Sequence, residues 1–318
     1  GIECFKKTAI LPSNQSPLGA LPARFRRPRV LIVGCGDVGM RVAARLKQGT
    51  QVLALTSQAA RVPLLRAHGV LGLVAQLDEP DTLWRFAGVA THVVHMAPPP
   101  SQGLFDPRTR ALVQALMRRS EPQSVVYGST SGVYGDCQGE WVDETRVLHP
   151  ESDRACRRVD AEQCLHAWGA RGLPRVTVLR IPGIYALDRE GGTPRERLQR
   201  GVPVLRRDED VFTNHVHADD LARATVLALW RGKPLRPVNV SDDSDMRMGD
   251  YMDWAADAWQ LPRPPRITWQ EAQTQLPAMT LSFMRESRRL HNRRLKEELR
   301  LRLRYPTVKE GLRGEPVG

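Results

Sequence analysis

The chain has 318 residues, of which 41% are hydrophobic, and its mean hydropathy of −0.39 is typical of a soluble globular protein. No apolar run approaches the roughly 18–20 residues that span a bilayer, so no membrane association is expected. The net charge of +12 comes mostly from arginines spread along the whole chain, and nucleic-acid binding would rest on that charge alone. Five cysteines without a Cys-x-x-Cys pair argue against disulfides and a zinc site, so we expect a cytoplasmic protein without metal.

Residues 1–28 contain five basic residues and four prolines, and they lack the apolar stretch of a secretory signal. We interpret them as a flexible basic extension, and whether they belong to the mature protein stays open.

A glycine motif follows directly after the first apolar strand, Val30–Val33. In the segment Gly34-x-Gly36-x-x-Gly39, the first glycine permits a tight turn, the second lets a pyrophosphate approach the backbone, and the third lets the helix pack on the strand. A helix over Val38–Lys47 then offers its N-terminal N–H groups to phosphates. The strand before and the helix after the glycines predict a dinucleotide site.

Apolar strands alternate with helical segments through the first half of the chain, which predicts a parallel sheet covered on both faces. The expected strands are Arg29–Val33, Gln51–Thr56, Gly72–Gln76, Thr91–Ala97, Ser124–Ser129 and Arg175–Arg180, and the expected helices between them are Val38–Lys47, Ala59–His68, Asp81–Phe86, Pro107–Arg119 and Arg154–Ala167. We therefore expect an α/β, Rossmann-like, doubly wound fold with a dinucleotide-binding domain over residues 29–180.

Beyond residue 180 the pattern changes to proline- and glycine-rich segments with helices expected at Ala218–Trp230, Asp250–Gln260 and Leu281–Leu299. We expect residues 181–318 to form a smaller, mostly helical substrate-binding cap, with 211–240 returning to the sheet.

The second strand ends at Thr56 and Ser57 without the acidic residue that holds the ribose of NAD in many such folds. Both hydroxyls tolerate a 2′-phosphate, and Arg61 could pair with it, so we expect NADP, with NAD as the open alternative. Asp78 is placed to accept from an adenine amino group, although helix capping explains it equally well.

Further blocks follow the glycine motif in a specific order. They are His95-Met-Ala-Pro-Pro99, Tyr127-Gly-Ser-Thr-Ser-Gly-Val-Tyr-Gly-Asp136, Trp141-Val-Asp-Glu144, Ala161-Glu-Gln163, Leu179-Arg-Ile-Pro-Gly-Ile-Tyr185, His215-Val-His-Ala-Asp-Asp-Leu-Ala222 and Val238-Asn-Val-Ser-Asp-Asp243. In these blocks, over about residues 29–312, the chain resembles the extended short-chain dehydrogenase/reductase superfamily, in its branch of NAD-dependent epimerases and dehydratases.

The resemblance implies that Ser129, Thr130 and Ser131 lie beside the nicotinamide ring and that Thr130 polarises the substrate. Simple turn chemistry is the alternative for these three hydroxyls. With the residues above, the expected cofactor-binding set is Gly34, Gly36, Asp37, Val38, Gly39, Thr56, Ser57, Arg61, Leu77, Asp78, Ala97, Pro98, Arg158, Ile181 and Pro182.

The chain departs from the family where redox members carry Tyr-x-x-x-Lys, because Arg154 and Arg158 stand at those two positions. A guanidinium stays protonated, so Arg154 is no general acid, whereas Arg158 could still reach a ribose or phosphate. Tyr134, His215 and His217 are the candidate replacements, although each is better explained as a structural residue.

Two functions from different classes follow. The first is an NAD(P)-dependent oxidoreductase or epimerase on a small carbonyl or sugar-nucleotide substrate. Arg154 and Arg158 could grip a phosphate or carboxylate of an anionic substrate. The second is a non-catalytic dinucleotide-binding or sensing protein, suggested by the lost Tyr/Lys pair. A homodimer that pairs through the helices Pro107–Arg119 and Arg154–Ala167 is a further prediction.

Overall fold

The computed structural model describes residues 27–318, so nearly all of the expected extension, 1–28, lies outside the described residues. Its last arginine, Arg27, is described and donates from Nε to the carbonyl of Gly49 at 2.6 Å.

Seven parallel strands form the central sheet in the order β12-β7-β5-β4-β1-β2-β3. Their bounds are β1 (Arg29–Val33), β2 (Gln51–Thr56), β3 (Leu71–Val74), β4 (His92–His95), β5 (Ser124–Thr130), β7 (Arg175–Ile181) and β12 (Arg236–Asn239). The strand order changes direction between β1 and β4, because β2 and β3 are added on one side of β1 and the later strands on the other side. At this point Val33 of β1 pairs with His95 of β4. Because ligands of doubly wound folds bind outside this switch point, the topology directs attention to the loops after β1 and β4. The Rossmann-like fold class is confirmed.

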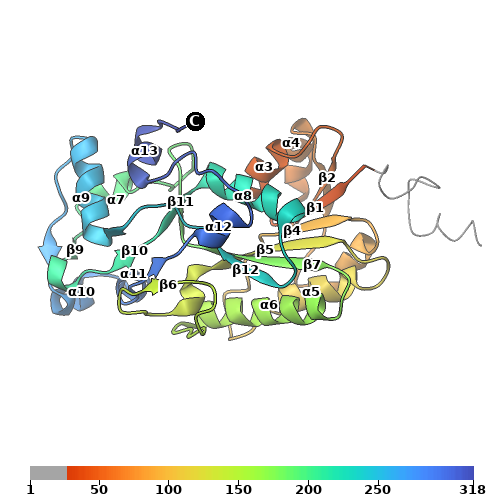
Figure 1. Cartoon of the computed structure of the whole chain (residues 1–318), viewed down its shortest axis with the longest axis horizontal. Coiled ribbons are helices and arrows are strands. Elements are labelled where there is room, and N and C mark those ends of the chain that lie inside the picture. The colour runs from red at the N-terminus through yellow and green to blue at the C-terminus, as the bar shows by residue number, and fades with distance from the viewer. Residues whose placement is uncertain (1–26) are drawn as a thin grey trace, which may run out of the picture.

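Helices cover both faces of the sheet (Figure 1). One layer holds α3 (Asp37–Ala44), α4 (Val62–Ala67), α8 (Ala218–Arg231) and α12 (Arg293–Glu297), and the other holds α5 (Pro107–Leu116) and α6 (Asp153–Ala170). Each layer has its own buried cluster, with Val42 and Leu221 on one face and Leu112 and Trp168 on the other. Short 3₁₀ turns complete this part: η2 (Ala59–Arg61), η3 (Pro80–Phe86) and η4 (Ser131–Tyr134).

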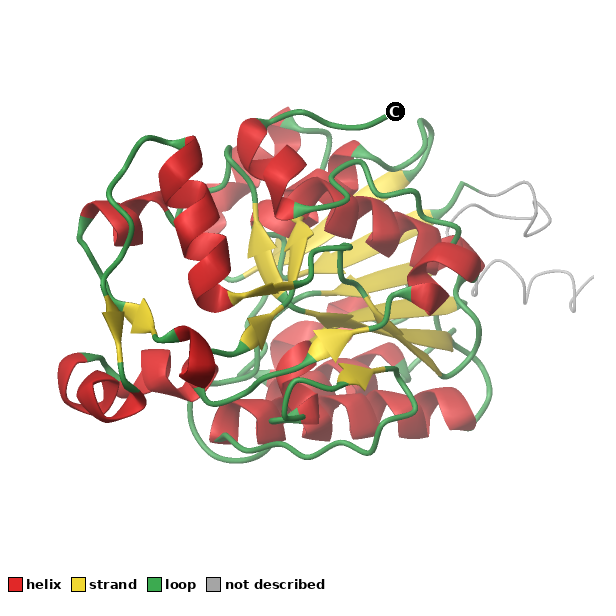
Figure 2. Ribbon diagram, turned by 60° about the vertical axis from the view of Figure 1, so that its left-hand side comes forward, coloured by secondary structure: helices red, strands yellow, loops and turns green. Residues whose placement is uncertain are grey.

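The remaining elements build a cap beyond the carboxyl ends of the strands (Figures 1 and 2). Its helices are α7 (Arg195–Gln199), α9 (Met248–Ala258), α10 (Trp269–Gln275), α11 (Ala278–Met284) and α13 (Val308–Arg313), with a 3₁₀ turn η5 (Arg207–Glu209). Four two-stranded ladders link the cap: β8 (Gly183–Tyr185) with β11 (His215–His217), β9 (Val204–Leu205) with β14 (Arg266–Ile267), β10 (Phe212–Thr213) with β13 (Met246–Arg247), and β6 (Trp141–Val142) with β15 (Arg289–Leu290). Of the segment 211–240, only β12 pairs with the central sheet.

The helix expected at Leu281–Leu299 is wrong, because α11, β15 and α12 divide this segment. Its middle is extended because its backbone pairs with the loop before β6. Cys137 N–H donates to the Ser287 carbonyl at 2.9 Å, and Arg289 N–H donates to the Glu140 carbonyl at 3.0 Å. Leu290 and Leu295 are still buried, but from separate elements. Tertiary pairing therefore overrides the local helical spacing.

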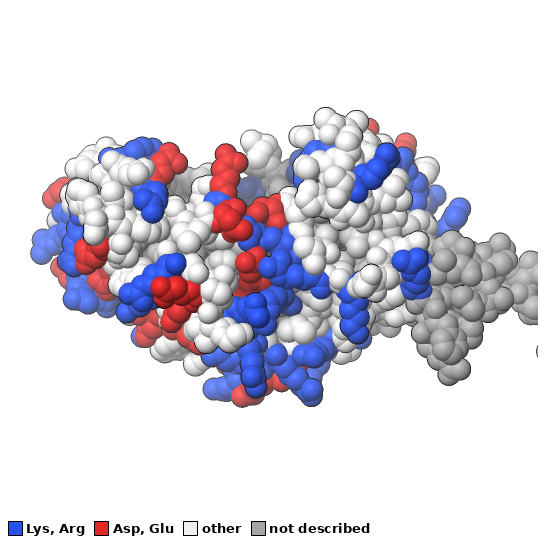
Figure 3. Space-filling view, turned by 90° about the horizontal axis from the view of Figure 1, so that it is seen from above, with Lys and Arg blue, Asp and Glu red and all other residues white. Residues whose placement is uncertain are grey.

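Two findings concern the described part of the chain alone. No helix in residues 27–318 is long and apolar enough to cross a membrane. No group of three or more His, Cys, Asp or Glu side chains there is arranged to hold a metal ion. On the face seen in Figure 3, acidic side chains lie among the basic ones.

Candidate functional site

The glycine turn joins β1 to α3 with little room to spare. Gly34 has a φ of +81°, and a Cβ added there would lie 2.5 Å from the backbone nitrogen of Ala97 at the end of β4. A Cβ on Gly39 would lie 3.2 Å from the Gly34 carbonyl oxygen, whereas one on Gly36 would meet nothing within 4 Å. Two glycines thus allow close packing, and the third leaves open space at the N-terminus of α3.

A cavity of about 350 Å³ lies over this open space. Its far wall comes from the ends of β5 and β7 and from α6. Its lining residues are Gly34, Gly36, Asp37, Val38, Gly39, Met96, Gly128, Ser129, Thr130, Arg158, Ile181, Pro182, Ile184, Arg189 and Leu221. The structure therefore brings together ten of the residues expected from the sequence. Nine of them lie at or directly after the ends of β1, β5 and β7, which meet at one edge of the parallel sheet, and Arg158 comes from α6.

The three hydroxyls after β5 have different environments. Ser129 is buried and donates to Oε2 of Glu162 at 2.6 Å, so its proton is already used. Thr130 Oγ1 accepts the N–H of Gly132 at 3.1 Å, which leaves its proton free to donate. Ser131 is buried and does not line the cavity. Thr130 is thus the hydroxyl placed to polarise a ligand.

Arg158 reaches into the cavity from α6. Its Nη1 donates to the Gly128 carbonyl and to the Tyr127 hydroxyl, both at 3.0 Å, while Nε and Nη2 have no hydrogen-bond partner among residues 27–318. Burial raises the pKa of Tyr127 to about 12 against the opposing effect of Arg158, so this tyrosine holds its proton. Arg154 does not line this cavity.

A loop that the sequence did not single out closes one side of the cavity. Arg189, after β8, pairs with Asp37 at 2.9 Å, and Arg41 of α3 pairs with both Asp37 and Asp188 at 3.0 Å. The carboxylate of Asp37, expected near a cofactor, is therefore neutralised by two guanidinium groups. The lining residues that the sequence analysis missed are Met96, Gly128, Ile184, Arg189 and Leu221. Only Arg189, in the loop after β8, lies outside the motif blocks.

The residues expected around the adenosine do not line the cavity. Thr56 Oγ1 bonds to the backbone of Gln58, while Ser57 is exposed. The charge of Arg61 acts on the buried thiol of Cys35, whose pKa rises to about 11 because burial outweighs that charge. Asp78 forms a two-bond ion pair with Arg108, at 2.8 and 3.0 Å, and this pair lowers its pKa.

Three other expected residues stand near this end. Leu77 is half-buried, Ala97 is buried and Pro98 is exposed, with its carbonyl 3.3 Å from Nη1 of Arg108.

The candidate replacement bases are structural in their contacts. Tyr134 is buried, donates to Asn239 at 2.6 Å and accepts from Arg180. Burial lowers the pKa of His215 to about 4. His217 caps α8 by accepting the Asp219 N–H at 3.0 Å, and burial lowers its pKa as well.

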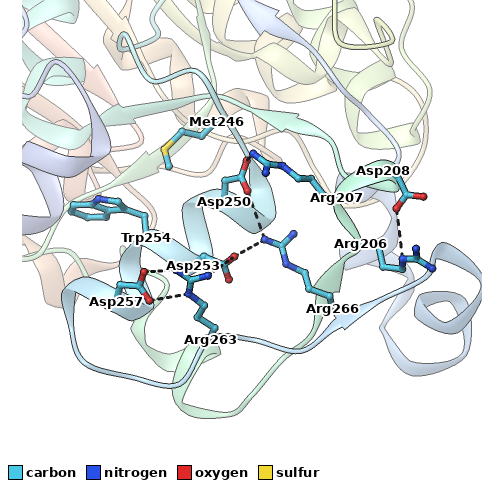
Figure 4. Close-up of a pocket in the computed structure, with 10 residues that line it drawn as sticks. All are labelled: Arg206, Arg207, Asp208, Met246, Asp250, Asp253, Trp254, Asp257, Arg263 and Arg266. Atoms are coloured by element: carbon cyan, nitrogen blue, oxygen red, sulfur yellow. Dashed lines mark hydrogen bonds and ion pairs between the residues drawn. The ribbon is translucent and has the colours of Figure 1, made fainter.

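The cap holds a larger hollow, which we call the cap groove, with a volume of about 740 Å³. Its walls are η5, α9 and β14 (Figure 4). Each of its arginines lies within 4 Å of an aspartate: Arg206 with Asp208, Arg207 with Asp250, Arg263 with Asp257, and Arg266 with Asp253. The groove is thus a set of ion pairs that joins three cap elements.

Known proteins resemble this chain over most of its length. A functionally unknown conserved protein from Silicibacter pomeroyi is 30% identical, with a TM-score of 0.76 over 91% of this chain and 98% of that one. UDP-glucose 4-epimerase from Thermotoga maritima, solved with UDP-glucose, is 20% identical with a TM-score of 0.71, over 89% and 96% of the two chains. MoeE5, solved with UDP-glucose and NAD, is 21% identical with a TM-score of 0.69, over 90% and 97%.

No curated protein sequence matches the chain. The family model for the NAD dependent epimerase/dehydratase family matches residues 30–241, about two thirds of its length. The resemblance seen in the sequence is confirmed, and the chain belongs to the NAD-dependent epimerase/dehydratase family.

Proposed function

We propose that the protein binds a nicotinamide dinucleotide in the cavity over the glycine turn and acts as an oxidoreductase or epimerase on a small carbonyl or sugar-nucleotide substrate. One observation carries the proposal: the open N-terminus of α3 at Gly36 lies in the same cavity as Thr130 and Arg158. UDP-glucose bound to two structural relatives gives a precedent for the substrate class.

The residues fit the cofactor at its phosphates and at its nicotinamide end. The space over Gly36 admits a pyrophosphate to the N–H groups of α3, and Arg189 balances the charge of Asp37 beside it. Arg158 has free N–H groups for the nicotinamide ribose. NADP is proposed over NAD because β2 ends in Thr56 and Ser57 without an acid and Arg61 lies near the turn.

The bound cofactor would supply hydride transfer, and the chain would supply orientation and polarisation. Thr130 would donate its free proton to a substrate carbonyl oxygen as negative charge develops there. Ser129 would hold the strand end through Glu162 and Arg180 rather than touch the substrate.

The cavity lining offers no evident general acid among the described residues. Among the described lining residues, only Asp37, Arg158 and Arg189 are ionisable, and Asp37 is held in ion pairs. This observation favours the second candidate function, a non-catalytic protein that binds the dinucleotide and reports its state to a partner. Turnover with a carbonyl substrate separates the two.

The test is a fluorescence titration of the full chain with NADPH and with NADH. We expect micromolar or tighter binding of NADPH and weaker binding of NADH. Gly36→Glu should abolish binding, because its carboxylate would occupy the pyrophosphate space, while Leu173→Glu adds the same charge on an exposed loop and should bind normally. Absence of binding by either nucleotide to the unaltered chain would reject the proposal.

A further inference from the structure

A second cavity of about 260 Å³, here called the arginine pocket, lies between the start of α6 and the cap helix α11. Its lining residues are Glu151, Ser152, Arg154, Ala278, Leu281, Ser282, Arg285 and Glu286.

The arginine pocket is a neighbour of the dinucleotide cavity. Arg154 and Arg158 are one turn apart on α6, which is about 6 Å along the axis, and residues four apart share a helix face. Arg158 lines the dinucleotide cavity and Arg154 lines the arginine pocket. From Thr130, which lines the dinucleotide cavity, η4 leads to Gly135, whose added Cβ would lie 3.2 Å from Glu151 of the arginine pocket. The arginine pocket and Thr130 are therefore linked through both α6 and η4.

The four charged residues of the arginine pocket differ in whether they have a partner of opposite charge. Glu286 contacts Arg288 at 3.4 Å, so this carboxylate has a cation outside the lining. Glu151 contacts His149 at 3.3 Å, which is an ion pair only when the histidine is protonated. Neither Arg154 nor Arg285 has a hydrogen bond or ion pair with any residue in 27–318. The guanidinium of Arg285 lies over Trp269, and that of Arg154 lies over Phe283, with its charge also acting on the carboxyl of Glu286. Unmatched guanidinium groups at a cavity wall favour a carboxylate or phosphate ligand.

Ser152 offers a further hydrogen-bond donor for an anion in the pocket. The Ser152 hydroxyl accepts the N–H of Ala155 at 3.0 Å as the cap of α6, which leaves its own proton to donate. The positive end of the 18-residue helix α6 lies at the same wall.

We infer that Arg154 and Arg285 bind the anionic group, a carboxylate or a phosphate, of a small substrate whose reacting carbon lies at Thr130. This inference rests on the proposed function, to which it adds the charge of the substrate and a specificity residue, Arg285, from the cap.

The test is calorimetric titration of the full chain with inorganic phosphate and, separately, with malonate. We expect at least one probe to bind, phosphate alone indicating a phosphate group and malonate a carboxylate. Arg154→Gln and Arg285→Gln should each weaken that binding about tenfold. Arg263→Gln is the control, because it removes a cap arginine that is already paired with an aspartate, and it should leave binding of the probe unchanged. Failure of both probes, or equal affinity in all three variants, overturns the inference.

A chemical measurement on the unaltered chain guards against misfolded variants. Phenylglyoxal should label Arg154 and Arg285, and the bound probe should protect both, as read by mass spectrometry. Labelling that the probe leaves unchanged overturns the inference. The NADPH titration is independent of it: loss of nucleotide binding with retained protection rejects the proposed function alone, and the reverse rejects the anion site alone.

Discussion

The cap groove and the arginine pocket are both lined by arginines, but they differ in whether each guanidinium has a carboxylate partner. In the groove, Arg263 and Arg266 lie 2.7 and 2.6 Å from aspartates (Figure 4). In the pocket, Arg154 and Arg285 have no such partner among the described residues. The larger hollow is therefore not the better candidate for an anion-binding site. Matched charges hold elements together, and unmatched charges are available to a ligand.

The contrast between paired and unpaired arginines extends to the core, where loss of a partner should have the largest effect on stability. The side chain of Arg180 is 7% exposed and pairs with Glu162 at 2.8 Å. Glu162→Ala should lower the free energy of unfolding by about 3–5 kcal/mol, because it leaves a buried guanidinium without its partner. Urea denaturation measures the loss.

Glu140→Ala is the matched control, because its partner Arg146 is on the surface, and its unfolding midpoint should scarcely move. Equal midpoints for the two variants would show that the buried pair contributes no more than a surface pair.

The next largest loss of stability is expected from a substitution in the cap groove. Arg266 lies between Asp210, whose side chain is 1% exposed, and Asp253. Arg266→Gln should lower the free energy of unfolding by about 1–3 kcal/mol, since it leaves a desolvated carboxylate without a cation. The same urea experiment measures it, and unaltered stability would mean that the groove is not held together by its ion pairs.

How far the sequence predicts the molecule differs between these regions. The glycine turn and Thr130 follow from motifs at strand ends, and a parallel sheet brings strand ends to one edge. Arg158, on α6, follows from the resemblance to the family, because it stands at the lysine position of Tyr-x-x-x-Lys. Arg285 and Arg189 could not be found this way. Arg285 lies in a segment whose helical spacing hid an extended middle, and Arg189 reaches Asp37 from a loop with no motif. Long-range pairing decides both positions, and one sequence carries no signal for it.

Whether a guanidinium is paired is equally invisible in the sequence. Arg154 and Arg266 are both arginines near acidic residues along the chain. Only the folded structure places three aspartates around Arg266 and an aromatic ring beside Arg154.

The affinity of the arginine pocket for an anion should change several-fold with pH. Burial raises the pKa of Glu286 above its usual 4.5, against the opposing charge of Arg288; Glu151 also raises it, and Arg154 lowers it. A bound anion raises this pKa further, so anion affinity should increase as the pH falls toward the pKa of Glu286 and decrease at higher pH.

Sulfate is the suitable probe, because its own charge is constant between about pH 5 and 8, so that any pH dependence in this range comes from the protein. Glu286→Gln should bind sulfate more tightly and remove most of the pH dependence. His149→Gln controls for the histidine beside Glu151. An unchanged pH profile in Glu286→Gln would place the carboxyl outside the reach of the anion.

The smallest effect on stability is expected in the pocket itself. Arg154→Gln and Arg285→Gln each remove only contact with an aromatic ring, so each should change the free energy of unfolding by less than about 1 kcal/mol. Urea denaturation of both variants beside Arg266→Gln measures the difference. A loss as large as that of Arg266→Gln would mean that the pocket arginines hold the cap in place, as the groove arginines do. A small loss combined with weakened anion binding separates the two roles, because the same residue type then stabilises the fold at one hollow and binds a ligand at the other.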